Sequence, residues 1–123
     1  MLTKGFFQLA KSASMNSNHR YKVGCVIALH GKPVTVGFNV CKSHPQYTTC
    51  EHPSIHAEVK AIINARCSLQ GGIAYVYRET RNGKPALAKP CDLCRNILQE
   101  AGIRIVYYST SEYPYWSKEK CTP

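Results

Sequence analysis

Two short segments of chemically active residues constrain this chain most: His-Ala-Glu at residues 56–58 and Pro-Cys-Asp-Leu-Cys at residues 90–94. Cys91 and Cys94 are three residues apart, so in the first turn of a helix both sulfurs project from one face toward one point. His56 stands in a similar way at the start of an apolar-periodic run. At a helix start, exposed N–H groups and the positive end of the dipole lower the pKa of a thiol. We therefore expect two helix starts to converge on one site.

The residue types of these segments are those of a metal centre. His56, Cys91 and Cys94 offer one nitrogen and two sulfurs, a donor set that zinc prefers. Three protein ligands leave the fourth tetrahedral position open to water, which is typical of catalytic zinc sites. Glu58 stays off the metal in this interpretation, and we expect it to carry protons between water and a ring nitrogen of the substrate. The spacing therefore predicts a zinc-dependent hydrolytic site.

Other interpretations of these segments remain open from the sequence. A fourth donor, either Cys50 or His52, would close the coordination shell and make the zinc structural. The chain would then be a non-catalytic, zinc-stabilised binding module, which has no use for Glu58 beside an open metal position. A redox C-x-x-C motif would account for Cys91 and Cys94, but it leaves the histidine and the glutamate unexplained.

Length and cysteine usage indicate one intracellular domain. The 123 residues are enough for a single core, so we expect one domain over residues 1–123. Seven cysteines is an odd number. Cys25 falls in an apolar alternating run and Cys67 near the end of a helical pattern, so we expect both to be buried thiols in reduced cytosol rather than half-cystines. No apolar stretch is long enough for a membrane span. These features predict a cytoplasmic protein with no membrane partner.

The charge balance is strongly basic. Sixteen Lys and Arg residues against seven Asp and Glu give a formal net charge of +9. Such an excess suits an anionic ligand, either a phosphate or a nucleic-acid backbone. A solvated basic surface is the alternative explanation.

Periodicity along the chain predicts alternating helices and strands. Helical patterns cover residues 4–15, 56–66 and 91–101, and strand patterns cover residues 23–29, 34–39, 73–79 and 103–109. Residues 109–120 are too few for a further helix and strand, so we expect them to return as an antiparallel terminal hairpin. The pattern predicts a layered α/β domain around a central mixed sheet of about five strands.

The chain resembles the cytidine deaminase-like superfamily over nearly its whole length. H-x-E followed by P-C-x-x-C is the signature of zinc-dependent base deaminases. Residues 23–27 (Val-Gly-Cys-Val-Ile) and 37–39 (Gly-Phe-Asn) are similar to elements of deoxycytidylate and tRNA adenosine deaminases. The resemblance implies a three-layer α/β/α fold, a sugar contact from Asn39 and a hydrogen bond from the Ala57 backbone N–H to the base. Alternatively, Asn39 simply turns the chain after its strand.

Subfamily features conflict within this resemblance. His-Ala-Glu is similar to the deoxycytidylate and polynucleotide branches, whereas residues 94–100 resemble the C-R-Q-x-L-x-E of nucleoside cytidine deaminases. Nucleoside enzymes carry Asn-x-Glu for the ribose, but Val40 and Cys41 follow Asn39 here. We therefore expect an enzyme of nucleotide metabolism that deaminates the cytosine of a small anionic nucleotide of the deoxycytidylate type. The alternative is a polynucleotide deaminase acting on cytosine or adenine in tRNA or single strands. Oligomers are common among relatives, so we expect a homo-oligomer.

An insertion precedes the second motif. Residues 79–89 separate the third predicted strand from Pro90, and Asn-Gly at residues 82–83 predicts a hairpin tip. Arg81, Lys84 and Lys89 lie in this insertion and are candidate contacts to a substrate phosphate. Solvated loop charges are the alternative.

Two further groups of residues have more than one explanation. The first group precedes the catalytic histidine and would supply a second zinc site, line the pocket, or form a polar loop; it comprises Cys41, His44, Cys50 and His52. The second group is the aromatic C-terminal segment, which would stack on bases of a single strand or pack a terminal hairpin; it comprises Tyr107, Tyr108, Tyr113, Tyr115 and Trp116.

Overall fold

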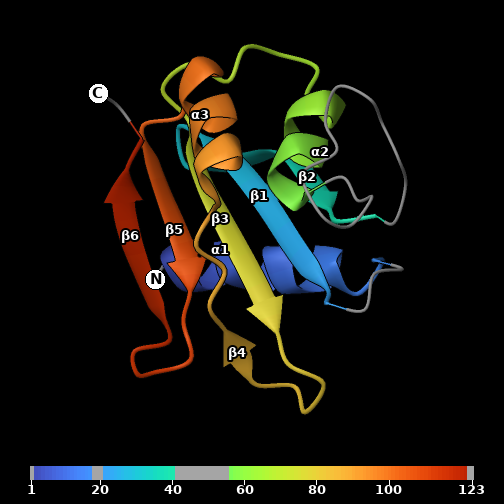
Figure 1. Ribbon diagram of the computed structural model, residues 1–123. Helices are drawn as coiled ribbons and strands as arrows, with labels where there is room; N and C mark the ends of the chain where they lie inside the picture. Colours follow the sequence, from blue (N-terminus) through green and yellow to red (C-terminus); the bar gives the residue numbers. More distant parts are fainter. Residues whose placement is uncertain (1, 18–20, 41–55, 122–123) are drawn as a thin grey trace.

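The helices and strands follow the predicted alternation. The computed structural model describes residues 2–17, 21–40 and 56–121 (Figure 1). Its elements, in chain order, are α1 (Leu2–Ser14), β1 (Val23–Leu29), β2 (Lys32–Phe38), α2 (Ala57–Asn64), β3 (Ile73–Glu79), β4 (Pro85–Ala86), α3 (Asp92–Glu100), β5 (Ile105–Ser109) and β6 (Trp116–Lys120). The predicted ranges differ from these mainly at their ends.

One mixed sheet carries the fold. Its strand order is β2-β1-β3-β5-β6, and β4 pairs with β3 beside this path. β3 and β5 are parallel, whereas β1–β2, β1–β3, β3–β4 and β5–β6 are antiparallel. The mixed sheet and the C-terminal hairpin are therefore confirmed. The additional short strand, β4, arises because the chain turns at the predicted tip, where Gly83 has a φ of 80° that glycine adopts without strain.

Helices cover both faces of the sheet. α1 crosses one face, and α2 and α3 lie on the other (Figure 1). Because successive strand residues point to opposite faces, Val26 and Tyr75 pack toward α1, whereas Ile27 and Val76 pack toward α2 and α3. The predicted three-layer α/β/α architecture is confirmed. In the described part of the chain, no helix is both long and apolar enough to cross a membrane.

The aromatic C-terminal segment divides into a packed part and an exposed part. Tyr107 stacks on Tyr75 with ring centroids 5.0 Å apart, and Trp116 lies 5.6 Å from Tyr107. Tyr113 and Tyr115 contact each other edge to face, but they are 86% and 48% exposed. Tyr108 packs against the core on the other face of the sheet. Packing therefore explains Tyr107, Tyr108 and Trp116, whereas Tyr113 and Tyr115 are available at the surface.

Gly24 permits the close approach of α1 to the sheet. A Cβ atom at this position would lie 1.9 Å from the backbone oxygen of Ala10. We expect Gly24→Ala to destabilise the protein by about 1–3 kcal/mol or more, because α1 must move away from β1 to relieve the clash. Urea unfolding measures the effect.

Gly5→Ala is the matched control for this prediction. Gly5 lies within α1, and a Cβ atom there meets nothing within 4 Å. Alanine is the better helix former by about 0.5–1 kcal/mol, so this variant should be slightly more stable than the wild type. Equal stability of the two variants would contradict the packing described for Gly24.

Candidate active site

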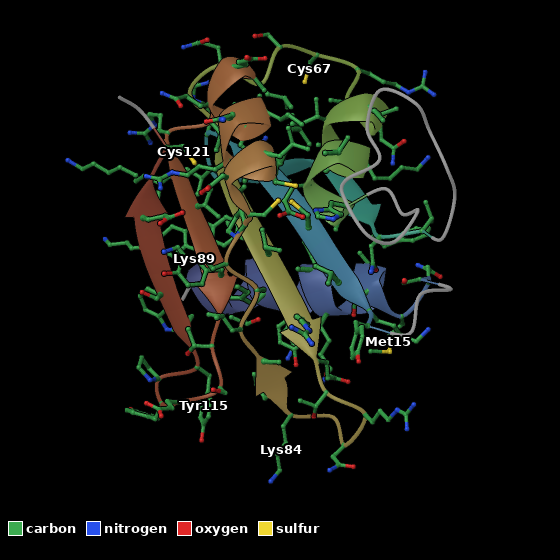
Figure 2. All side chains as sticks on the ribbon, in the orientation of Figure 1. Met15, Cys67, Lys84, Lys89, Tyr115 and Cys121 are labelled. Atoms are coloured by element: carbon green, nitrogen blue, oxygen red, sulfur yellow. The ribbon has the colours of Figure 1, made fainter. Side chains whose placement is uncertain are left out.

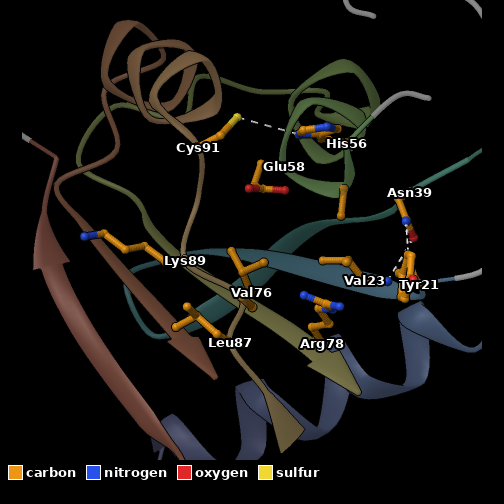
Figure 3. Close-up of a pocket in the computed structure, with 12 residues that line it drawn as sticks. Tyr21, Val23, Asn39, His56, Glu58, Val76, Arg78, Leu87, Lys89 and Cys91 are labelled. Carbon is orange, nitrogen blue, oxygen red and sulfur yellow. Dashed lines mark hydrogen bonds between the residues drawn. The ribbon is translucent and has the colours of Figure 1, made fainter. Parts of the chain in front are cut away.

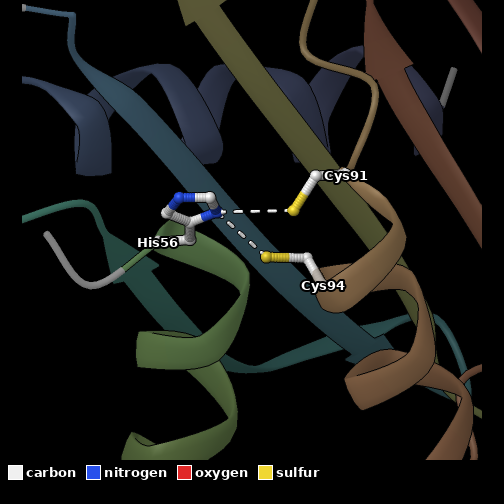
Figure 4. A group of neighbouring side chains, drawn as sticks. All are labelled: His56, Cys91 and Cys94. Atoms are coloured by element: carbon white, nitrogen blue, oxygen red, sulfur yellow. Dashed lines mark hydrogen bonds between the residues drawn. The ribbon is translucent and has the colours of Figure 1, made fainter. Parts of the chain in front are cut away.

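The three predicted metal donors lie at the starts of two helices on one face of the sheet. His56 and Cys91 occupy the N-cap positions of α2 and α3, each with extended backbone angles. Cys94 follows in the first turn of α3 and is fully buried. The helices thus begin one residue later than the motif alone indicated. The predicted convergence of the three donors on one site is still observed, because both helix starts face the same point (Figure 4).

The spacing of the donor atoms suits a tetrahedral metal ion. His56 Nδ1 lies 3.1 Å from Cys94 Sγ and 3.9 Å from Cys91 Sγ. The three donor atoms all lie within 4.8 Å of one another. Tetrahedral zinc with ordinary Zn–N and Zn–S bond lengths would separate such a nitrogen and sulfur by about 3.5 Å, a value between the two distances. The geometry and the donor chemistry therefore both fit zinc.

Glu58 lies beside this group without belonging to it. The carboxylate is in the first turn of α2, is only 5% exposed, and points into the pocket (Figure 3). Burial raises the pKa of Glu58 to about 7, while hydrogen bonds with its own backbone N–H and with Cys94 act in the opposite direction. A buried carboxyl group at this position can exchange protons with a molecule in the pocket.

The pKa of Cys94 differs from the sequence-based expectation. A helix start was expected to lower the pKa of the thiol, but burial raises it, and the negative charge of Glu58 raises it further. The dipole effect is modest compared with the cost of removing a thiolate from water. Metal binding at this site must therefore release a proton from Cys94.

A pocket adjoins the donor group. Its volume is about 290 Å³, close to the lower end of the range for small-molecule sites, which suits one small ligand. Apolar side chains from β1, β3 and the segment before α3 form much of its wall (Figure 3). The lining residues are Tyr21, Val23, Asn39, His56, Ala57, Glu58, Val76, Arg78, Leu87, Ala88, Lys89 and Cys91.

Asn39 and Ala57, the predicted substrate contacts, both line this pocket. The Asn39 side chain is tied to the protein: its Oδ1 accepts hydrogen bonds from the Val23 N–H at 2.9 Å and the Ser17 hydroxyl at 2.7 Å. Its Nδ2 donates to the Tyr21 carbonyl at 2.6 Å. These bonds hold the chain that leaves β2 against the start of β1, which agrees with the alternative that Asn39 turns the chain after its strand. Its sugar contact stays a prediction. Ala57 is the first residue of α2, so its N–H lacks an acceptor within the helix.

The structure distributes the predicted phosphate contacts unevenly. Arg81 and Lys84 lie in the turn between β3 and β4 and are absent from the pocket lining. Figure 2 shows Lys84 at the opposite end of the sheet from α2 and α3. Lys89 lines the pocket, but its Nζ lies 3.8 Å from Glu119 Oε2 on β6. Arg78, which was not among the sequence-based candidates, also lines the pocket. The alternation of side chains along a strand could have identified Arg78, because it is two residues after the buried Val76 and therefore lies on the same face of β3.

The group of candidates for a second zinc cannot be placed. Cys41, His44, Cys50 and His52 lie outside the described residues. Their predicted roles, including closure of the first site by Cys50 or His52, stay predictions. Within the described ranges, the metal-binding group consists of His56, Cys91 and Cys94.

Comparison with known proteins identifies the family. Residues 2–110 match the family model described as the cytidine and deoxycytidylate deaminase zinc-binding region. The chain belongs to this family. Zinc is the cofactor that the family description names, and the His56, Cys91 and Cys94 group could hold it.

A curated relative from Thermus thermophilus shares part of its sequence with this chain. The chain is 29% identical over 99 residues to the tRNA(Ile)-lysidine synthase of two strains of this organism. The matched stretch is 80% of this chain but only 16% of the synthase, so the chain spans a small part of these relatives.

Solved structures of deaminases share the fold. The dCMP deaminase of cyanophage S-TIM5 superposes with a TM-score of 0.67 at 22% identity, covering 89% of this chain and 82% of the phage chain. That phage enzyme has also been solved in complex with dCMP and dUMP. The cytidine deaminase of Burkholderia pseudomallei gives a TM-score of 0.68 at 19% identity, covering 96% and 91% of the two chains. At these identities the comparison shows a common fold.

Proposed function

We propose that this protein is a zinc-dependent hydrolytic deaminase that converts the cytosine of a small nucleotide of the deoxycytidylate type to uracil and releases ammonia. The observation that carries the proposal is a His-Cys-Cys donor group at the wall of one pocket, which His56, Cys91 and the buried Glu58 line together. The family supports it, and so does the fold shared with a phage enzyme solved in complex with dCMP and dUMP.

The residues of the pocket have separate roles in this proposal. His56, Cys91 and Cys94 would hold zinc, with Glu58 beside them. When bound, zinc lowers the pKa of a water ligand from about 15.7 to about 7. Glu58 takes a proton from water and gives it to the ring nitrogen beside the attacked carbon, then assists the departing ammonia. The apolar wall formed by Val23, Val76 and Leu87 keeps the base in contact with protein rather than solvent. Water and cytosine are thereby consumed, and uracil and ammonia are formed.

Turnover of a substrate panel tests the proposed substrate class. We expect dCMP to give the highest kcat/KM, deoxycytidine a lower value, and a cytosine-containing single strand the lowest. The physical reason is the small pocket of about 290 Å³ on a strongly basic chain, which suits a compact anion. Preference for the nucleoside, or turnover of the strand alone, would contradict the assignment to a nucleotide.

Deamination of a polynucleotide is the second candidate. The exposed ring pair Tyr113 and Tyr115 supports it, since such rings stack on unpaired bases. The partial relative is named for tRNA modification, which also bears on nucleic acid. Oligonucleotide affinity that falls steeply with salt, and that drops on Tyr113→Ala, would favour this candidate over the mononucleotide enzyme.

A further inference from the structure

Arg78 is a cation in the pocket that none of the sequence motifs includes. It lies near the carboxyl end of β3 and lines the pocket together with Glu58. We propose that the Arg78 guanidinium binds the phosphate of the nucleotide substrate. The assignment rests on the proposed function, because it names the group by which that same site would select a nucleotide over a nucleoside.

The pleat of β3 fixes where the Arg78 side chain lies. Val76 is buried in the core between the sheet and helices α2 and α3, and Arg78 follows it by two residues on the same face. Tyr77, between them, belongs to the opposite core under α1. Figure 3 shows Val76 between Glu58 and Arg78, so the cation lies away from the reactive carboxylate along the pocket. A nucleotide with its base near Glu58 would direct its phosphate toward Arg78.

In the described part of the chain, the guanidinium of Arg78 lies over an aromatic ring and pairs with no carboxylate. Its central carbon lies 5.1 Å from the centre of the Tyr21 ring, another pocket residue. Among the ion pairs found in the described ranges, none includes Arg78. Its backbone N–H donates to Ser109 Oγ at 3.0 Å, which anchors the main chain at this point. The charge is thus oriented by an aromatic ring and is left for an anionic ligand.

Lys89 also lines the pocket, but unlike Arg78 it forms an ion pair with a carboxylate. Its ammonium lies 3.8 Å from Glu119, and in Figure 3 it points away from Glu58. A lysine with a carboxylate partner must give up that ion pair to bind a phosphate, whereas Arg78 pairs with no carboxylate among the residues that the structure describes. Arginine also presents a planar fork of N–H donors that matches phosphate oxygens in a bidentate manner. The geometry therefore favours Arg78 over Lys89 as the phosphate ligand.

Product binding tests the assignment independently of turnover. The affinities of the zinc-loaded protein for dUMP and deoxyuridine, measured by calorimetry, give the phosphate preference as a ratio. We expect wild type to prefer dUMP by about 10- to 100-fold, as for hydrogen bonds to a charged group. Arg78→Gln should bring the ratio close to one, and Arg78→Lys should leave part of it, since lysine keeps the charge but loses the fork. Arg66→Gln, at an exposed arginine outside the pocket, should retain the full ratio.

Each outcome has a defined meaning. A wild type that binds dUMP no better than deoxyuridine, or an Arg78→Gln protein that keeps the preference, would overturn the assignment. If Arg78→Gln does not fold, an undiminished preference in Arg78→Lys would overturn it equally. If Arg78→Gln loses affinity only for a short single strand that contains deoxyuridine, and not for dUMP, the assignment to a mononucleotide phosphate is overturned. Arg78 would then bind a phosphodiester. Turnover of dCMP is measured separately. If dCMP is not turned over but the preference for dUMP depends on Arg78, only the proposed function is contradicted. If dCMP is turned over but the preference does not depend on Arg78, only this assignment is contradicted.

Discussion

Replacement of Glu58 by glutamine should abolish ammonia release while zinc content and fold stay as in the wild type. Glutamine has the same shape, but its amide cannot accept a proton from water and pass it to the ring. Such proton transfer contributes about 10²- to 10⁴-fold to rate, so we expect kcat to fall by at least that range. Glu58 lies outside the His-Cys-Cys donor group, which is why the metal should remain. Ammonia release and zinc per chain are measured on the same sample.

Glu100→Gln is the matched control for this substitution. Glu100 is an exposed glutamate at the end of α3, and its replacement makes the same change of charge away from the pocket. This variant should keep full activity. Retained activity in Glu58→Gln would contradict the proton-transfer role, and a zinc-replete wild type inactive on every substrate would favour the non-catalytic binding module.

Replacement of Cys91 by alanine should remove zinc and activity together. Cys91 is exposed at the N-cap of α3, so its truncation leaves no cavity in the core and tests the metal alone. Loss of an outer-shell partner typically costs about 10- to 100-fold in metal affinity, and we expect loss of a direct ligand to exceed that range. Zinc titration against a chelator of known affinity measures the change. With zinc present, the melting temperature of Cys91→Ala should lie close to that of the metal-free wild type, because zinc binding stabilises the fold that holds it.

The control is Cys67→Ala. Cys67 was predicted to be buried, but the helix ends at Asn64 and leaves it exposed in the following loop. It lies outside the donor group, so its replacement should leave zinc affinity unchanged. Normal zinc stoichiometry and affinity in Cys91→Ala would refute its assignment as a ligand. An equal loss in both variants would mean that the method reports non-specific thiol binding.

Local sequence patterns predicted the parts of the fold that depend on neighbouring residues. The period-2 run at residues 23–29 became β1, and Asn-Gly at residues 82–83 became the turn that forms β4. Cys91 and Cys94 face one point because both lie at the start of α3, and His56 lies at the start of a second helix, α2. These arrangements are fixed by chain geometry over a few residues, which the sequence contains directly.

Features set by long-range contacts were not predictable in the same way. The ion pair between Lys89 and Glu119 joins residues that meet only because β6 returns beside β5. The hydrogen bonds of Asn39 depend on the segment before β1. The raised pKa of Cys94 follows from burial between helix and sheet, which outweighs the helix start. Arg78 belongs to no local motif, and its place in the pocket depends on the packing of β3 against distant segments.

Ammonia release by the zinc-loaded protein with dCMP is the most direct measurement of the central claim. The sample is stripped of metal, divided, and half of it is reloaded with one zinc ion per chain. We expect the reloaded half to release one ammonia for each uracil formed, and the stripped half to release none. Ammonia release at equal rates in both halves would contradict zinc-dependent deamination, and so would its absence from the reloaded half.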